Sequence, residues 1–159
     1  MTLKETRLSY DLSQIEAASI LGVPVRTYRR YENDEDYGSI FKRQRFIEIL
    51  NSRFEVTEDK GLLKVGDIKI KLTSLFDSEY KDEINLCYLF GSYAKGTAKE
   101  SSDVDLYVSS SLTGFHLVGL IEKIRQALHK RVDVLRDSEL NNNIELVNEI
   151  MKNGIKIYG

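Results

Sequence analysis

The spacing of apolar residues divides the chain into two patterns. Throughout residues 1–54 apolar positions recur at intervals of three and four, which predicts helices only. From residue 66 onwards, helical spacing alternates with short apolar runs, which predicts helices and strands in turn. Residues 55–65 include Glu-Asp-Lys-Gly and are expected to form a linker. We therefore predict a helical module over 1–54, a linker over 55–65 and a second domain over 66–159.

Within the helical module, turn and capping residues predict a helix-turn-helix. Ser13 and Glu16 have the spacing of a capping box, which begins a helix. Gly22 is suited to end that helix, and Pro24 is suited to the first turn of the next one. Two helices joined by a tight glycine-containing turn form a helix-turn-helix. Further helices are expected over residues 3–10 and 40–54.

The second domain is expected to contain a small mixed sheet flanked by helices, an α+β or α/β architecture. Residues 66–80 fit either a helix or a strand hairpin, and we favour the helix because the apolar spacing continues beyond Leu72. Strands are predicted over 85–90, 104–108, 131–135 and 155–158, and helices over 117–128 and 140–151.

Composition is that of a globular protein and narrows the possible partners. The net charge of −2 excludes a strongly basic nucleic-acid binder, so DNA contact would depend on a local arginine cluster. No apolar run approaches the roughly 18 residues needed to span a membrane, and the first residues have no signal-peptide core. The single Cys87 cannot form an internal disulfide, which fits a cytoplasmic location.

Two aspartates begin the strand predicted over 104–108. Alternate residues on a strand point to the same face, so Asp103 and Asp105 are expected side by side. Neighbouring carboxylates repel each other unless a cation neutralises them, and their oxygens suit Mg²⁺. The Gly91-Ser92 turn after the preceding strand offers backbone N–H groups and a hydroxyl to a phosphate, and a polar loop is expected after it. This pattern indicates a metal-dependent site for a nucleoside triphosphate.

A third carboxylate, Asp133, lies between two valines in the strand predicted over 131–135. We expect this strand to be buried, where an unpartnered charge is costly. If it pairs with the strand of Asp103 and Asp105, Asp133 joins them and accepts the proton of an attacking hydroxyl, or holds its metal. The alternative interpretation of the first motif is that Asp103-Val104-Asp105 lies in a solvated edge strand and that Gly91-Ser92 is an ordinary turn.

The order of these motifs resembles that of the minimal nucleotidyltransferases, small relatives of DNA polymerase beta. Gly91-Ser92 is followed after ten residues by Asp103-Val104-Asp105, and the intervening Tyr93-Ala94-Lys95-Gly96 also matches. Ser102, Asp133 and a final Gly-x-x-x-Tyr strand continue the resemblance, which covers roughly residues 66–158.

The resemblance implies transfer of a nucleoside monophosphate from ATP or another triphosphate to a hydroxyl, with release of pyrophosphate. Asp103 and Asp105 would bind Mg²⁺, and Asp133 would act as general base and complete the metal-binding set. Gly91 and Ser92 would hold the triphosphate. Lys95 either approaches a phosphate or is a solvated loop lysine. An inactive member of the fold is the alternative, although all of these residues are present.

The helical module resembles the helix-turn-helix of Cro and phage repressors, from Leu12-Ser13-Gln14 to Arg30-Tyr31-Glu32. The resemblance implies that Arg7 pairs with Glu32. It also implies phosphate contact by Gln14, base contact by Arg26 and Arg29, and backbone contact by Thr27 and Arg30. Pro24 replaces the serine that usually caps the recognition helix. The alternative is a module used for dimerisation or partner contact.

A helix-turn-helix fused to a minimal nucleotidyltransferase resembles the antitoxins of two-gene toxin–antitoxin systems. The resemblance implies a small HEPN-type toxin ribonuclease as partner, AMP transfer from ATP to a toxin tyrosine, and repression at operator DNA. It also suggests a homodimer or a hetero-oligomer with the toxin.

Two other functions remain open. The protein could neutralise its toxin by binding alone, or it could adenylylate a small molecule. Small-molecule adenylylation is not favoured, because the chain leaves no residues for a further substrate-binding domain.

Overall fold

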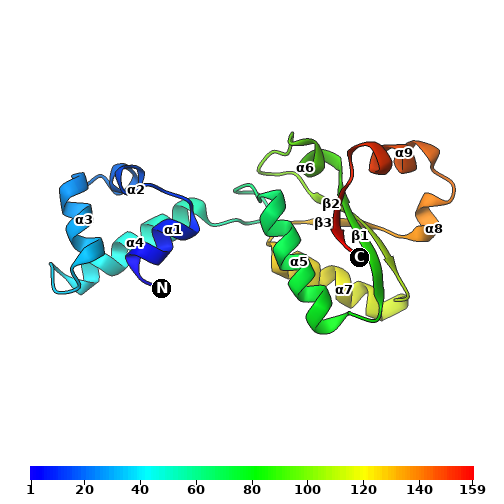
Figure 1. The fold of residues 1–159 in the computed structure, drawn as a ribbon, viewed down its shortest axis with the longest axis horizontal. Helices are drawn as coiled ribbons and strands as arrows, with labels where there is room; N and C mark the ends of the chain where they lie inside the picture. The colour runs from blue at the N-terminus through cyan, green and yellow to red at the C-terminus, as the bar shows by residue number, and fades with distance from the viewer. The chain divides into compact units, whose positions relative to one another are not determined.

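The computed structural model describes residues 1–159, which form two compact units (Figure 1). The first unit spans Met1–Glu55 and the second spans Val56–Gly159. Each unit has its own cluster of buried apolar side chains. None of the helices is long and apolar enough to cross a membrane.

The first unit contains four helices: α1 (Leu3–Ser9), α2 (Gln14–Leu21), α3 (Val25–Asn33) and α4 (Ile40–Phe54). The predicted capping box is confirmed, because the Ser13 hydroxyl accepts from the Glu16 backbone N–H while the Glu16 carboxylate accepts from that of Ser13. Gly22 ends α2 in the left-handed region, with φ of 64°. Pro24 precedes α3 and supplies no side-chain cap. The predicted helix-turn-helix is therefore formed by α2 and α3.

The core of this unit is built from the facing sides of the four helices. Ala17, Ala18, Tyr28 and Leu50 are fully buried there. The small alanines of α2 allow α3 to approach closely, and the aromatic rings of α3 pack toward α4. Tyr31 makes edge-on contact with Phe46, with ring centroids 5.2 Å apart. Burial of one apolar face, rather than helix propensity, stabilises such short helices.

The second unit is a four-stranded mixed sheet with helices on both faces, as predicted. The strands follow the order β3-β2-β1-β4, and only the β2–β3 pair is parallel. The strands are β1 (Ile84–Phe90), β2 (Val104–Ser110), β3 (Val132–Leu135) and β4 (Ile155–Tyr158), and the helices are α5 (Val65–Glu79), α6 (Gly91–Lys95), α7 (Gly114–Leu128), α8 (Asp137–Leu140) and α9 (Ile144–Asn153).

One face of the sheet carries the core, and the other carries the candidate site. Alternate residues of β2, namely Val104, Leu106 and Val108, are buried against the core-forming helices α5 and α7. The residues between them, including Asp105 and Tyr107, are only half-buried on the opposite face. Helices α8 and α9 lie on that second face (Figure 1). The alternation of β2 therefore directs its polar residues away from the core.

The segment after α4 contributes to the second unit from Val56 onwards, although residues 55–65 are assigned to a linker on sequence grounds. Leu63 is buried in the core of this unit, and Thr57 and Lys60 form an isolated bridge. The fully buried Lys130 donates from Nζ to the carbonyl oxygens of Glu58, Lys60 and Glu100, at 3.3, 3.2 and 2.5 Å. These bonds compensate the buried charge and fix the segment to the turn before β2.

Two sequence predictions about local structure are wrong. Gly91–Lys95 forms the short helix α6, where a loop was expected, and Gly96 ends it with φ of 71°. The helix expected over 140–151 is interrupted: α8 ends at Leu140, and Asn143 caps a new helix by accepting from the Leu146 N–H at 3.0 Å. Apolar spacing alone does not reveal such an interruption, whereas the asparagine run does signal it. The helix preferred for residues 66–80 is confirmed as α5.

Candidate active site

The candidate site is centred on Asp105 in β2. Strand register places Asp105 beside Phe90 of β1 on one side and Asp133 of β3 on the other. Phe90 is the last residue of its strand, so the Gly91-Ser92 motif follows at the edge of the site. The sheet therefore brings together three sequence motifs that are separated along the chain.

Gly91 lies directly against the carboxylate of Asp105. Its φ of 67° is in the left-handed region, and a Cβ at this position would be 2.1 Å from Oδ2 of Asp105. No other amino acid fits without displacing the aspartate or straining the backbone. The glycine is thus required twice, by the turn from β1 into α6 and by the close approach of the carboxylate. Ser92 is half-buried as the second residue of α6.

Negative charge accumulates around Asp105. Burial and the neighbouring carboxylates of Asp133, Asp103 and Glu149 together raise the pKa of its carboxyl to about 6, while Lys95 opposes them. A group whose ionised form is disfavoured in this way would be stabilised by a cation. This excess of negative charge would favour a metal ion or a positively charged side chain on this face of the sheet.

Asp103 is positioned by an arginine from the start of β3. Asp103 immediately precedes β2, and its Oδ1 accepts from Nε of Arg131 at 3.0 Å. Arg131 also pairs with Asp59 at 3.2 Å and donates to the carbonyl of Ser101 at 3.3 Å. The side chains of Arg131 and Asp103 are 45% and 51% exposed. Water therefore screens their ion pair, and an entering cation can compete with the arginine for Asp103.

Asp133 is exposed, whereas the sequence analysis expected a buried strand. The reason is topological: β3 pairs only with β2 and forms the edge of the sheet. Asp133 is nevertheless the register partner of Asp105. An exposed edge position leaves this carboxylate accessible to an incoming group.

Lys95 is engaged by a carboxylate that the sequence analysis missed. Its Nζ lies 2.5 Å from Oε1 of Glu149, which belongs to α9. Lys95 and Glu149 lie close enough to Asp105 for their charges to influence its pKa. Glu149 belongs to no motif of the chain, and only its position on the amphipathic helix α9 could have drawn attention to it. Lys95 is thus in reach of the site and is held by an ion pair.

The donor set suits Mg²⁺ chemically. Carboxylate oxygens are its preferred protein ligands, and the excess negative charge around Asp105 favours a cation there. No group of three or more His, Cys, Asp or Glu side chains is already arranged to hold a metal ion. Asp103, Asp105 and Asp133 would be chemically suitable ligands, with phosphates supplying further oxygens.

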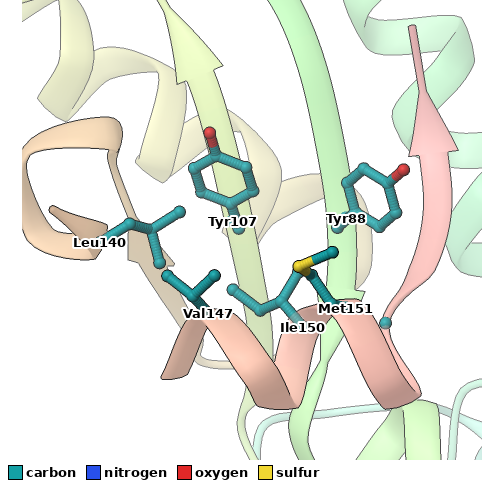
Figure 2. A pocket seen from close by; sticks show the side chains of 7 residues that line it. Tyr88, Tyr107, Leu140, Val147, Ile150 and Met151 are labelled. Carbon is teal, nitrogen blue, oxygen red and sulfur yellow. The ribbon is translucent and has the colours of Figure 1, made fainter. Parts of the chain in front are cut away.

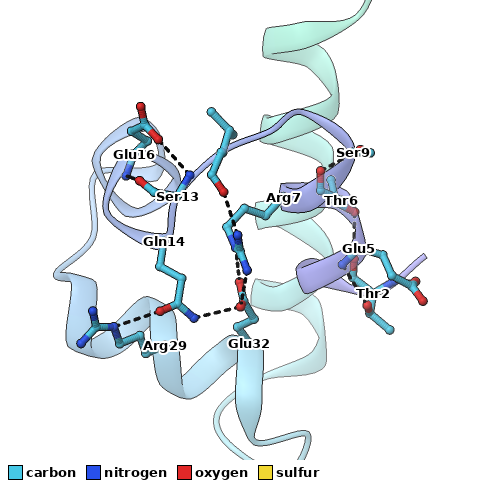
Figure 3. A network of polar contacts seen from close by, with 11 residues as sticks. Thr2, Glu5, Thr6, Arg7, Ser9, Ser13, Gln14, Glu16, Arg29 and Glu32 are labelled. Carbon is cyan, nitrogen blue, oxygen red and sulfur yellow. Dashed lines mark hydrogen bonds and ion pairs between the residues drawn. The ribbon is translucent and has the colours of Figure 1, made fainter. Parts of the chain in front are cut away.

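The predicted DNA-binding residues lie on α2 and α3 of the first unit, where some of them contact one another (Figure 3). Gln14 donates to Glu32 at 2.9 Å and accepts from Nε of Arg29 at 3.0 Å. Arg30 covers the ring of Tyr37 at 4.0 Å, while Arg26 is exposed and Thr27 is half-buried. The expected pair of Arg7 and Glu32 is confirmed, with contacts of 2.8 and 2.9 Å.

Two family models match the chain, one within each unit. Residues 70–159 match the family model described as polymerase beta, nucleotidyltransferase. The chain belongs to this nucleotidyltransferase family. Residues 3–38 match a helix-turn-helix family model. The family match includes Gly91, Ser92, Asp103, Asp105 and Asp133 within its range. No curated protein matches the chain.

Among solved structures, this nucleotidyltransferase is similar to components of toxin–antitoxin complexes. One is a toxin–antitoxin with AMP-PNP, at 26% identity and a TM-score of 0.47 over 57% of this chain and 73% of that one. Another is a tri-AMPylated Shewanella oneidensis HEPN toxin with its MNT antitoxin, at 23% identity and a TM-score of 0.43, covering 58% and 70%. A mutant MntA–HpeT toxin–antitoxin has 25% identity and a TM-score of 0.48, covering 57% and 73%.

Proposed function

We propose that this nucleotidyltransferase is an antitoxin that transfers AMP from ATP to a tyrosine hydroxyl of a HEPN-type toxin ribonuclease, in a Mg²⁺-dependent reaction. The observation that carries the proposal is the close approach of Gly91 to Asp105, with Asp133 as register partner of Asp105. The helix-turn-helix in the same chain supports the choice of an antitoxin, since this fusion resembles such proteins.

In the proposed reaction the tyrosine oxygen forms a bond to the α-phosphorus of ATP while the α–β phosphoanhydride bond breaks. Pyrophosphate leaves with the electron pair, and the hydroxyl proton passes to a carboxylate, for which the exposed Asp133 is the candidate. Gly91, Ser92 and Lys95 would hold the phosphates. Mg²⁺, held by Asp103 and Asp105, would neutralise charge that develops on the phosphoryl group.

We propose a second role for the first unit, repression of the toxin–antitoxin operon. The exposed arginines of α3, with Gln14 at the start of α2, form the predicted DNA-facing surface. An operator-binding titration at two salt concentrations tests this role. Arg26→Ala should weaken binding, because Arg26 is exposed and is free to reach a base edge.

The catalytic proposal is tested with purified protein, Mg²⁺, labelled ATP and the toxin encoded beside it. The wild-type protein is expected to label the toxin, and the Asp103→Ala/Asp105→Ala double variant is expected not to do so. Equal labelling by the double variant would show that the site is assigned wrongly.

The second candidate function is an antitoxin that neutralises its toxin by binding only. The ion pair between Arg131 and Asp103 favours this candidate, because it engages a proposed metal ligand. Mass spectrometry of the neutralised toxin distinguishes the two functions. An unchanged toxin mass after complete neutralisation would support binding only.

A further inference from the structure

An open hollow lies between the sheet and helices α8 and α9. It has a volume of about 360 Å³ and is lined by Tyr88, Tyr107, Leu140, Val147, Ile150 and Met151 (Figure 2). We call it the sheet-face hollow. Its volume is at the lower end of the roughly 300–1,000 Å³ typical of ligand pockets, which suits a single ring better than a whole nucleotide.

The sheet-face hollow and the candidate active site are neighbours on the same face of the sheet. Tyr107 follows Asp105 by two residues on β2, so both side chains lie on the same face of the sheet. Tyr88 of β1 is the register partner of Tyr107, just as Phe90 is the partner of Asp105. One step of two residues, roughly 7 Å, therefore separates Asp105 from the floor of the hollow.

The hollow and the proposed phosphate-binding turn lie on opposite sides of Asp105. Along β1, Tyr88 comes first, then Phe90 beside Asp105, and then Gly91. In phosphoryl and nucleotidyl transfer the attacking and leaving oxygens are roughly in line. If pyrophosphate leaves on the side of Gly91 and Ser92, the attacking hydroxyl must arrive from the side of the hollow.

The lining favours an apolar ring over a nucleobase. Leu140, Val147, Ile150 and Met151 supply aliphatic and thioether surface, as Figure 2 shows. The hydroxyl of Tyr107 is already engaged, donating to Oδ1 of Asp137 at 2.5 Å. A nucleobase presents several donors and acceptors that require placed polar partners, whereas a phenol ring requires only packing and an outlet for its hydroxyl.

We propose that the sheet-face hollow seats the aromatic ring of the acceptor tyrosine and presents its hydroxyl to the α-phosphate beside Asp105 and Asp133. This inference rests on the proposed function, whose acceptor site it specifies. Met151 is 81% exposed at the rim, where its flexible thioether can close over an entering ring. The acceptor segment then enters over α9, and the nucleobase lies elsewhere.

A binding experiment tests the hollow without turnover. The chain contains two methionines, Met151 in the hollow and Met1 in the first unit, so methyl-¹³C methionine labelling reports on the hollow with an internal reference. N-acetyl-tyrosinamide is expected to shift the Met151 methyl signal and to leave Met1 unchanged, with Met151→Leu assigning the signals. Adenosine is expected to shift neither. The proposal would be overturned if the Met151 signal shifted with adenosine but not with N-acetyl-tyrosinamide, or if it shifted with neither compound.

A kinetic experiment tests the same surface during catalysis. Met151→Glu should raise KM for the toxin about tenfold, because the variant loses apolar contact with the bound acceptor. KM for ATP should stay within about twofold, because ATP does not contact Met151 in this proposal. Ile70→Glu is the matched control, since Ile70 is 69% exposed on α5, which covers the other face of the sheet. Raised KM for ATP, or unchanged KM for the toxin, would contradict the proposal.

The two experiments separate this inference from the proposed function. If the wild-type protein does not modify the toxin, the catalytic proposal fails, and the methionine titration still decides whether the hollow binds a phenol ring. If the wild-type protein modifies the toxin but the hollow binds no ring, only the acceptor site is assigned wrongly.

Discussion

The two units contain similar arginine–carboxylate pairs in opposite environments. In the first unit, the side chains of Arg7 and Glu32 are 11% and 1% exposed and belong to a network that Gln14 completes. In the second, Arg131 and Asp103 are about half exposed beside the crowded carboxylate of Asp105. The same chemistry therefore has two consequences: the buried pair stabilises the first unit, whereas the exposed pair can separate when a cation approaches Asp103.

This difference predicts how variants in each unit will fail. Polar groups that satisfy one another contribute to stability, and removing one leaves its partner buried without compensation. Polar groups of like charge that are held together reduce stability and are retained where they serve a reaction. Variants in the first unit should therefore lose stability, whereas variants around Asp105 should lose activity.

The largest expected effect is on catalysis. Gly91→Ala should reduce nucleotidyl transfer about a thousandfold, equivalent to about 4 kcal/mol, because its Cβ would displace the Asp105 carboxylate. Gly66→Ala is the matched control, because Gly66 lies in α5 with no neighbour within 4 Å of a new Cβ. Initial rates with labelled ATP measure the difference. Comparable rates for both variants would mean that this close approach is not needed.

The next effect is on the stability of the first unit. Glu32→Ala should reduce its unfolding free energy by about 3 kcal/mol, because Arg7 keeps its buried charge and loses its partner. Glu48→Ala removes an exposed partner, that of Arg45, and should cost about 0.5 kcal/mol or less. Urea unfolding followed by helix circular dichroism compares the two. Equal losses would contradict the contrast between buried and exposed pairs.

A smaller effect is expected with pH. Burial raises the pKa of Glu32, but hydrogen bonds from Arg7 and Gln14 outweigh it and hold the pKa below its ordinary value. The pair therefore contributes fully above pH 4.5, and its contribution is lost as the pH falls through the lower pKa of the folded state. The stability difference between wild type and Glu32→Gln should shrink as the pH falls below the ordinary carboxyl pKa and through the lower pKa of folded Glu32. A constant difference would show that ionisation of Glu32 does not stabilise the unit.

The smallest effect concerns the exposed pair. Arg131→Gln should leave the stability of the second unit nearly unchanged, because water screens its two ion pairs. Removing the arginine should also lower the Mg²⁺ concentration needed for half-maximal transfer, since the guanidinium no longer competes with Mg²⁺ for Asp103. A higher requirement for Mg²⁺ would show that Arg131 mainly orients this aspartate.

Local signals in the sequence were sufficient for most, but not all, elements of the fold. The capping box of Ser13 and Glu16, the glycine that ends α2 and the helical spacing of α5 depend on neighbouring residues, and the structure confirms all three. The mixed sheet was also predicted, because apolar runs alternated with helical spacing. The interruption between α8 and α9 was not predicted, because the apolar spacing continues through it.

The environment of the site depends on contacts that are distant in the chain. The exposure of Asp133 follows from the edge position of β3, which no local pattern of valines reveals. The pairs of Lys95 with Glu149 and of Arg131 with Asp59 join residues that only the folded chain brings together. The motifs thus predicted which residues to consider, and strand order determined their partners.

The central claim is that Asp105 serves nucleotidyl transfer rather than folding. Its most direct test is Asp105→Asn, which keeps the shape of the side chain and removes its charge. The toxin is incubated with Mg²⁺, ATP and either wild type or variant, and its intact mass is measured beside the unfolding free energy of each protein. We predict that wild type adds AMP and that the variant adds none while being at least as stable. An equal gain of mass with the variant would contradict the account.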